Sequence, residues 1–338
     1  MVDGEGALTW RSRTALVTGI GGFVGGGLAL ELLRRGARVV GIVRDSAGSR
    51  LLGRLGILDG VELVSGSIAE PGIVQRAINE YEVDTVFHLA AQAIVGVANR
   101  SPLSTFESNI TGTWQLLEAA RLSRLVRRVV VASSDKAYGD QDVLPYTEET
   151  PLAGTYPYDA SKVCTDVLAR CYAVTYDLPI AVIRCANIYG PGDLNWSRLI
   201  PGTVRSVLQG ERPIIRSDGT PERDYLYLDD AVDGYLRVAD YLPAGTGEAF
   251  NLGTGVAVSA LSLVNTILTA AGRRDLAPII LGQGDGEIDR QCLSADKAQR
   301  LLDWAPLTSL ITGLGQTVDW YAGHLKLDAP HVFEKVLA

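Results

Sequence analysis

Short apolar runs alternate with helical segments through the first half of this chain. The runs predict β-strands at Thr14–Thr18, Arg38–Val43, Val61–Val64, Thr85–Leu89, Arg128–Ala132 and Ile180–Ile183. The segments between them predict helices at Phe23–Arg35, Ile73–Glu80, Pro102–Arg121 and Pro157–Tyr176. Near-continuous apolar strands joined by helices are typical of a parallel sheet that is covered on both faces. Because such crossovers are right-handed, we expect an α/β fold built on a doubly wound, Rossmann-type sheet.

A glycine-rich loop joins the first strand to the first helix. Residues 18–25 read TGIGGFVG. In this pattern Gly19 permits a tight turn, Gly22 lets the backbone approach a pyrophosphate, and Gly25 lets the helix pack closely on the strand. The helix that follows points its first N–H groups at the phosphates. Because the loop follows a strand and opens a helix, it predicts a dinucleotide site rather than a purely structural turn.

The pattern changes after Arg184, where Gly, Pro, Asn and Trp become frequent and later elements are irregularly spaced. We expect residues 1–184, with a returning segment at about 224–255, to form the NAD(P)-binding domain. Residues 185–223 and 256–338 are expected to form a smaller, substrate-binding α/β domain. It would pack over the carboxyl ends of the strands, where ligands of such sheets bind.

Composition excludes several classes of function. Of the 338 residues 47% are hydrophobic, which argues against disorder, and the net charge of −8 argues against binding to nucleic acid or to an anionic membrane. No apolar run reaches the ~18 residues of a membrane span. The first residues carry no signal pattern, so we expect a cytoplasmic protein. The four cysteines form no C-x-x-C pair and the three histidines are scattered, so we expect no disulfide framework and no metal site.

Tyr158 and Lys162 are four residues apart in a predicted helix and therefore share one face. A free tyrosine ionises near pH ~10, and an adjacent cation favours the phenolate. The pair predicts a general base, and the lysine can also reach a ribose hydroxyl. The alternative is an incidental pair on a solvated helix.

Three polar residues, Ser134, Asp135 and Lys136, follow the strand at residues 128–132. Strand ends at this edge of the sheet face the ligand crevice. A hydroxyl, a carboxylate and an ammonium in succession predict a site that polarises a carbonyl and moves protons. The alternative is a polar turn.

Together these motifs resemble the extended short-chain dehydrogenases/reductases of the NAD-dependent epimerase/dehydratase family, which act on nucleotide sugars. The resemblance extends over about residues 13–325. It implies a catalytic triad of Ser134, Tyr158 and Lys162. It also implies cofactor contacts along the glycine loop and the fourth strand, at Gly19, Gly22, Phe23, Val24, Gly25, Leu89, Ala90, Ala91, Tyr158 and Lys162.

Two positions depart from the family pattern. Members often place Asp after strand three to bind the adenine amino group, whereas this chain has Ser67 followed by Ile68. The ribose position after strand two lacks an acid and has Arg44 beside Asp45. Arg44 would accept the 2′-phosphate of NADP, whereas Asp45 would repel it, so both NAD and NADP stay open. The resemblance implies that the cofactor is tightly bound and recycled.

Further motifs implied by the resemblance concern the substrate, a nucleotide-diphosphate sugar. Residues 88–92 (HLAAQ) match the strand-four signature, and the substrate motifs are residues 184–192 (RCANIYGPG), 197–201 (SRLIP) and 223–225 (RDY). The arginines of the last two motifs resemble residues that hold the diphosphate, as two negative phosphates require. The residues implied in substrate binding are Gln92, Ser134, Asn187, Arg198, Leu199 and Arg223.

The Ser134–Lys136 run bears on the outcome of the reaction. Its order of Ser, Asp and Lys resembles the pattern of 4,6-dehydratases that act on CDP-glucose, so the resemblance implies a 4,6-dehydratase. Tyr158 would remove the C4 hydroxyl proton during oxidation to a 4-keto sugar, Lys136 would remove the C5 proton, and Asp135 would protonate the leaving hydroxyl. The alternative is a 4-epimerase of the same family, in which Asp135 and Lys136 bind substrate.

The helices at Pro102–Arg121 and Pro157–Tyr176 carry more apolar residues than one sheet face should cover. These residues are Trp114, Leu116 and Leu117 on one helix and Val163, Val167, Leu168 and Tyr172 on the other. In the family such helices pair with their symmetry mates as a four-helix bundle, which implies a homodimer. The alternative is that all these side chains fill the intramolecular core.

Overall fold

The computed structural model describes residues 10–45, 49–242, 244–283 and 288–328. A parallel sheet with the strand order β10-β6-β5-β4-β1-β2-β3 forms its centre. The strands are β1 (Thr14–Thr18), β2 (Arg38–Val43), β3 (Val61–Ser65), β4 (Thr85–His88), β5 (Arg128–Ala132), β6 (Ile180–Cys185) and β10 (Ala249–Leu252). The doubly wound sheet is confirmed, and the six strands predicted from sequence differ from the observed bounds by at most two residues.

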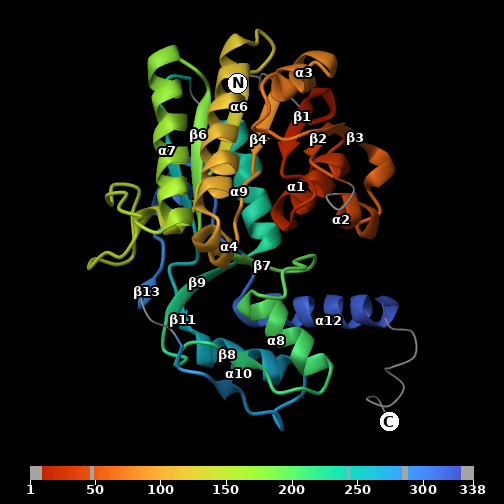
Figure 1. Ribbon diagram of the computed structural model, residues 1–338, viewed down its shortest axis with the longest axis vertical. Coiled ribbons are helices and arrows are strands. Elements are labelled where there is room, and N and C mark those ends of the chain that lie inside the picture. Colours follow the sequence, from red (N-terminus) through yellow and green to blue (C-terminus); the bar gives the residue numbers. More distant parts are fainter. Residues whose placement is uncertain (1–9, 46–48, 243, 284–287, 329–338) are drawn as a thin grey trace, which may run out of the picture.

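Helices cover both faces of this sheet, because its strands bury side chains on both sides (Figure 1). On one face Ala15 and Val17 of β1 pack with α1 (Phe23–Arg34) and α9 (Leu228–Tyr241). On the other face Leu16 packs in the cluster formed with α3 (Ile73–Glu80), α6 (Gly112–Leu122) and α7 (Pro157–Tyr176). The remaining elements of this part are η1 (Trp10–Ser12), α2 (Arg50–Arg54), η3 (Leu58–Gly60), α4 (Val95–Arg100) and α11 (Asp296–Leu302).

The long helix predicted at Pro102–Arg121 is present, but a π-helical turn interrupts its regular winding. It consists of α5 (Pro102–Phe106), a π-helical turn η4 (Glu107–Thr111) and α6. The wide turn surrounds Asn109, which is 1% exposed and whose side-chain amide bonds both the N–H and the C=O of Gln92, at 2.7 and 3.2 Å. These bonds tie the helix to the segment after β4, which accounts for the local change of winding.

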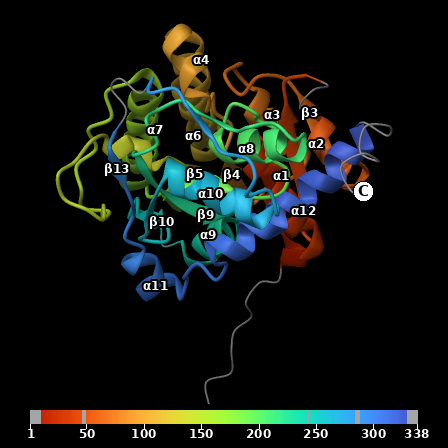
Figure 2. The ribbon, with the colours of Figure 1, turned by 90° about the horizontal axis from the view of Figure 1, so that it is seen from below.

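A second, smaller sheet lies below the first (Figure 1). Its central strand β9 (Glu222–Tyr227) pairs with β7 (Asn187–Tyr189), β11 (Ala257–Ser259) and β13 (Arg290–Gln291). A separate pair is formed by β8 (Ile214–Ile215) and β12 (Ile279–Ile280). Three helices accompany these strands and lie in front of the large sheet in Figure 2, namely α8 (Leu199–Leu208), α10 (Ala260–Ala270) and α12 (Leu310–Asp328).

The chain between residues 224 and 255 serves both sheets, since β9 belongs to the small sheet and β10 to the large one. The division into domains at residues 184, 223 and 255 stays a prediction. Within the described ranges, no helix combines the length and the apolar character that a transmembrane span requires.

Candidate active site

A cleft of about 1000 Å³ lies where the carboxyl ends of β4, β5 and β6 meet α8 and the small sheet. The segments at the carboxyl ends of the large sheet contribute Leu89, residues 132–136 and residues 185–186 to its wall. Strand β7 of the small sheet contributes residues 187–189, and α7 contributes Tyr158 and Lys162. Residues 195–206 and 214–217 form the opposite wall. The cleft therefore brings all five residues predicted to be catalytic together with Asn187, Arg198, Leu199 and Arg223.

The glycine loop forms a cradle at the start of α1. Gly19 has a φ of +72°, and a Cβ atom there would lie 2.8 Å from the backbone N of Ala90. A Cβ atom on Gly25 would lie 2.2 Å from the carbonyl oxygen of Gly19, so the loop and the helix touch. Gly22 caps the helix without any side-chain hydrogen bond. No side chain caps the first N–H groups of α1, so the positive end of the helix dipole is available to an external anion. The loop therefore fits the pyrophosphate of a dinucleotide.

His88, at the end of β4, supports this loop from inside. It is 2% exposed, and its ring is hydrogen-bonded to the hydroxyls of Thr18 at 2.9 Å and Thr113 at 3.0 Å. Burial, with a smaller effect from Lys162, lowers the pKa of His88 to about 3. The ring is therefore neutral at physiological pH and links β1, β4 and α6 rather than transferring protons.

Tyr158 and Lys162 lie on the face of α7 that borders the cleft, with the ammonium group of Lys162 over the Tyr158 ring. Burial raises the pKa of Tyr158 to about 12, with Ser134 and Arg198 lowering it and Asp135 and Asp159 raising it. Lys162 Nζ donates to the carbonyl oxygen of Ala132 at 2.8 Å and is 6.0 Å from the centre of the Tyr158 ring. The expectation that the lysine lowers the tyrosine pKa is therefore not met in the protein alone. Burial also lowers the pKa of Lys162, to about 8.

Residues 134–136 form a tight turn at the start of η5 (Asp135–Tyr138). The Ser134 hydroxyl donates to Asp135 Oδ1 at 2.9 Å and accepts from the N–H of Lys136 at 3.2 Å. Asp135 is 4% exposed, and Lys136 Nζ donates to the side-chain oxygen of Gln291. All three side chains line the cleft beside Tyr158. The turn thus presents a hydroxyl, a carboxylate and an amine to one space.

The proposed diphosphate arginines differ in their surroundings. Arg198 Nη1 is 2.8 Å from Asp193 Oδ2, and the two side chains are 40% and 6% exposed. Arg223 is 8% exposed and donates to the carbonyl oxygen of Glu222 at 2.8 Å. The Asn187 side chain donates to the carbonyl oxygen of Asp224 at 3.4 Å, and Asp224 is the residue that follows Arg223. Both guanidinium groups border the cleft.

Other predicted binding residues lie outside the lining of the cleft, among them Arg44, Ser67, Ile68 and Gln92. Arg44 is exposed at the end of β2. The Ser67 hydroxyl accepts from the N–H of Ala69 at 3.3 Å, and Ile68 is 7% exposed and packs in the core. The side-chain oxygen of Gln92 accepts from the N–H of Ile94 at 3.1 Å. Arg44 and Ser67 follow β2 and β3, on the same edge of the sheet as the glycine loop.

Sequence reasoning missed several residues of this region. Asp159 is 4% exposed, and burial, with a contribution from Asp135, raises its pKa to about 6, whereas Lys136 lowers it. The available signal was its position next to Tyr158. Arg205 lines the cleft and lies over the Trp196 ring, 5.2 Å from its centre. It is two helical turns beyond Arg198, a spacing that places both on one face of α8.

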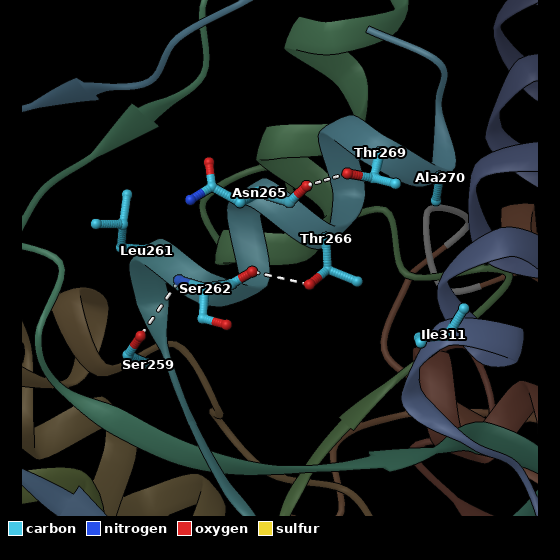
Figure 3. Close-up of a pocket in the computed structure, with 8 residues that line it drawn as sticks. All are labelled: Ser259, Leu261, Ser262, Asn265, Thr266, Thr269, Ala270 and Ile311. Atoms are coloured by element: carbon cyan, nitrogen blue, oxygen red, sulfur yellow. Dashed lines mark hydrogen bonds between the residues drawn. The ribbon is translucent and has the colours of Figure 1, made fainter. Parts of the chain in front are cut away.

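A second hollow of about 600 Å³ lies along α10 (Figure 3). Its lining is Ser259, Leu261, Ser262, Asn265, Thr266, Thr269, Ala270 and Ile311. The hydroxyls are engaged locally, since Thr266 and Thr269 donate to the carbonyl oxygens four residues earlier at 2.9 and 3.0 Å. The lining residues include no acid, base or cation. This hollow therefore offers no group for catalysis.

In the part of the chain that the structure describes, no group of three His, Cys, Asp or Glu side chains is placed to hold a metal ion.

Comparison with known proteins agrees with this geometry. Residues 15–253 match the model of the NAD dependent epimerase/dehydratase family. The chain is 33% identical over 309 residues to a UDP-glucose 4-epimerase of Mycolicibacterium smegmatis, covering 90% of this chain and 97% of that protein. It is also 33% identical over 331 residues to a dTDP-glucose 4,6-dehydratase of Xanthomonas campestris, covering 91% of this chain and 93% of that protein.

A solved structure shows the same likeness. The crystal structure of a dTDP-glucose 4,6-dehydratase from Bacillus anthracis, in complex with NAD, has a TM-score of 0.82 and 28% sequence identity. The likeness covers 93% of this chain and 98% of that one. The family resemblance predicted from the motifs is confirmed. The chain is a nucleotide-sugar-modifying enzyme of extended short-chain dehydrogenase/reductase fold and belongs to the NAD-dependent epimerase/dehydratase family.

Proposed function

We propose that this protein is a nucleotide-diphosphate-sugar 4,6-dehydratase. The observation that supports this most directly is that Asp135 and Lys136 line the same cleft as Tyr158. Oxidation at C4 needs one base. Loss of water across C5 and C6 needs a second base and an acid. An amine and a carboxylate beside the tyrosine supply both.

The cofactor we propose is NAD, which the Bacillus anthracis neighbour contains. The cradle of Gly19, Gly22 and Gly25 would hold its pyrophosphate at the start of α1. When bound, NAD accepts the hydride from C4 and returns it to C6, and its positively charged ring favours the ionised form of a nearby phenol.

In the first half-reaction the phenolate of Tyr158 takes the proton of the C4 hydroxyl. The Ser134 hydroxyl, which lines the cleft with Tyr158 and lowers the pKa of its phenol, would hold the same substrate oxygen. Lys162 is fixed to the Ala132 carbonyl and orients the ribose. In the protein alone the pKa of Tyr158 is about 12, so the phenol is the resting form and ionises only in the loaded site.

In the second half-reaction the 4-keto group acidifies the C5–H bond. Lys136, as the neutral amine, takes the C5 proton. The electron pair of that bond forms the C5–C6 double bond, while the C6–O bond breaks and Asp135 gives its proton to the departing hydroxide, which leaves as water. Return of the hydride to C6 and of a proton to C5 gives a 4-keto-6-deoxy sugar, so the cofactor is unchanged overall.

A 4-epimerase is the second candidate, and one observation favours it. The Mycolicibacterium smegmatis epimerase is as similar to this chain as the Xanthomonas dehydratase, at 33% identity. In an epimerase the keto sugar turns over and takes the hydride back on its other face. Asp135 and Lys136 would then bind substrate only.

The mass of the product distinguishes these reactions, since dehydration removes one water and epimerisation leaves the mass unchanged. Purified protein is incubated with dTDP-glucose, UDP-glucose, CDP-glucose and GDP-mannose in separate reactions. Asp135→Asn and Lys136→Met are run in parallel, and both should lose water elimination while still forming reduced nicotinamide. An unchanged product mass in every reaction, or full product from both variants, would contradict the dehydratase assignment.

We also propose a homodimer formed through α6 and α7, which pack side by side at the surface (Figure 1). Part of the apolar set predicted for this contact is wrong, because Leu116 and Leu117 are fully buried in the intramolecular core. Trp114 and Val167, however, are 44% and 54% exposed, and Val174 is 65% exposed. Apolar side chains gathered on one helix pair support a self-complementary contact.

A further inference from the structure

Gln291 is a fully buried residue of the small sheet that contacts the catalytic turn. It is 0% exposed, and its side-chain oxygen accepts a hydrogen bond from Lys136 Nζ. Its side-chain nitrogen donates to the carbonyl oxygen of Gly139 at 3.3 Å, so both ends of the amide bind the segment from 136 to 139. Lys136 and Gln291 are 155 residues apart in sequence.

The backbone that carries Gln291 is held on both sides. In the small sheet Gln291 is in register with Arg223 of β9. On the other side Tyr146 N–H donates to the Cys292 carbonyl at 2.9 Å, and Ser294 N–H donates to the Tyr146 carbonyl at 2.8 Å. Asp224 Oδ2 also accepts from the N–H of Leu293 at 3.3 Å. The backbone hydrogen bonds therefore hold the Gln291 amide in one place, and the hydrogen bond to this amide orients the flexible side chain of Lys136.

An amide oxygen suits a lysine that has to act as a base. It accepts one hydrogen from the amine and fixes the direction of the nitrogen, but it carries no charge. A carboxylate in its place would favour the ammonium form. Among the described residues, Asp135 on the same turn as Lys136 and Asp159 on α7 are acidic groups of this cluster, and both are buried. A neutral amide adds no negative charge of its own beside Lys136.

We propose that Gln291 is a positioning residue for Lys136, which it orients toward the C5 hydrogen of the 4-keto intermediate. This inference rests on the proposed dehydratase function. In this proposal Gln291 affects catalysis by aligning Lys136, so oxidation at C4 by Tyr158 should not depend on it. The small sheet thereby takes part in the elimination step as well as in binding.

The test separates the two half-reactions in Gln291→Met, which removes the acceptor but keeps the volume, and in Gln291→Glu, which adds a charge. Gln299→Met, at an exposed site on α11, is the matched control. The nucleotide sugar that the wild type converts is used in deuterium oxide. Reduced nicotinamide is followed by absorbance, and deuterium at C5 is followed by mass spectrometry of the product and the recovered substrate.

In Gln291→Met we expect C5 deuteration to fall by about 10-fold to 100-fold, because the amine loses its alignment, with C4 oxidation within about twofold of wild type. In Gln291→Glu we expect the acid limb of the dehydration pH profile to move up by about one pH unit, because the ammonium is favoured and the amine must be neutral to act. The Gln299→Met control should match wild type. Retained C4 oxidation also shows that each variant is folded.

Two results would overturn the inference in distinguishable ways. If the wild type dehydrates its substrate but both Gln291 variants keep wild-type C5 deuteration and pH profile, the positioning role is wrong and the dehydratase function stands. If the wild type returns a 4-epimer without deuterium at C5, the proposed function fails and the role of Gln291 fails with it.

Discussion

Arg184 and Asp166 form a two-point ion pair, with N–O distances of 2.8 and 2.9 Å, and neither side chain is more than 1% exposed. Arg184 also donates to the hydroxyl of Tyr138 at 2.9 Å, and that hydroxyl donates to Asn251 at 2.7 Å. The pair therefore joins β6 and α7 to the end of the catalytic turn η5 and to β10. Asp166 lies one helical turn beyond Lys162.

Replacing Asp166 with Leu should destabilise the protein strongly. The variant leaves the Arg184 guanidinium buried without its charged partner, at a cost of about 3–5 kcal/mol in the free energy of unfolding. The double variant Asp166→Leu/Arg184→Met should recover most of this loss, because no unpaired charge remains. Urea unfolding measures both. The exposed pair Arg76–Glu80 is the control, and Arg76→Met should cost less than about 1 kcal/mol. A loss below about 1 kcal/mol in Asp166→Leu would contradict the argument.

Tyr158→Phe should abolish turnover while the protein keeps its affinity for NAD. The change removes the hydroxyl that takes the C4 proton and leaves the ring in place, so we expect kcat to fall by about 100-fold or more. Product formation and NAD binding are measured separately, by mass spectrometry and by calorimetry. Tyr156→Phe, at an exposed position on the preceding turn, should behave as wild type. A Tyr158→Phe variant with most of its activity would show that another group is the base.

The sequence predicts most of the large sheet because each of its six predicted strands is a short, mainly apolar run. β10 is only four residues long, and its residues show no clear alternation of apolar and polar side chains. The sequence therefore indicates it only as part of the segment at about 224–255 that returns to the first domain. The π-helical turn at Asn109 was also missed. It depends on bonds to Gln92 and Ser161, which the helical pattern of residues 102–121 does not reveal.

The candidate site was predictable to the extent that it follows local rules. Spacing places Tyr158 and Lys162 on one face of a helix, but it does not give the direction of Nζ, which binds the Ala132 carbonyl. Burial, which decides the pKa of Tyr158, is likewise a property of the packed molecule. The contact between Lys136 and Gln291 joins segments with no common motif, so only the fold reveals it.

Arg223→Ala should mainly raise KM, by about tenfold or more, if this arginine holds the diphosphate, because the lost contact is made equally in the ground state and the transition state. Steady-state kinetics with the converted nucleotide sugar checks this. Arg290→Ala is the matched control, since Arg290 lies on the neighbouring strand β13, is 59% exposed and pairs with Glu222. An unchanged KM in Arg223→Ala would remove this residue from the diphosphate site.

Val167→Glu should convert the protein to monomers and reduce its activity. The side chain lies on α7, the helix that carries Tyr158, and a charge there would be desolvated twice in a two-fold contact. Sedimentation at micromolar concentration and turnover are measured on the same sample. Leu307→Glu is the control, because Leu307 is 90% exposed and lies outside α6 and α7. A monomeric wild type with full activity would rule out the dimer.

The ionised carboxylate of Asp159 should lower the free energy of unfolding at neutral pH, compared with a neutral side chain at the same position. Burial raises the pKa of its carboxyl from 3.8 to about 6. Between these two values the folded state holds a proton that the unfolded state has lost, so the contribution of this group to stability is complete below about pH 4 and is lost as the pH rises through about 6. A tenfold change in proton affinity corresponds to about 1.4 kcal/mol, so the loss is of the order of 1–3 kcal/mol.

Asp159→Asn should therefore be more stable than wild type by about 1–3 kcal/mol at about pH 7.5, and the difference should vanish below about pH 4, where the carboxyl is protonated in the folded and the unfolded chain alike. Urea unfolding of both proteins above and below this range gives the comparison. Asp142→Asn, in an exposed segment, should show no such change with pH. An Asp159→Asn variant that is less stable at neutral pH would mean that the carboxylate stabilises the fold through Lys136 by more than its burial costs, and that Lys136 is held as the ammonium.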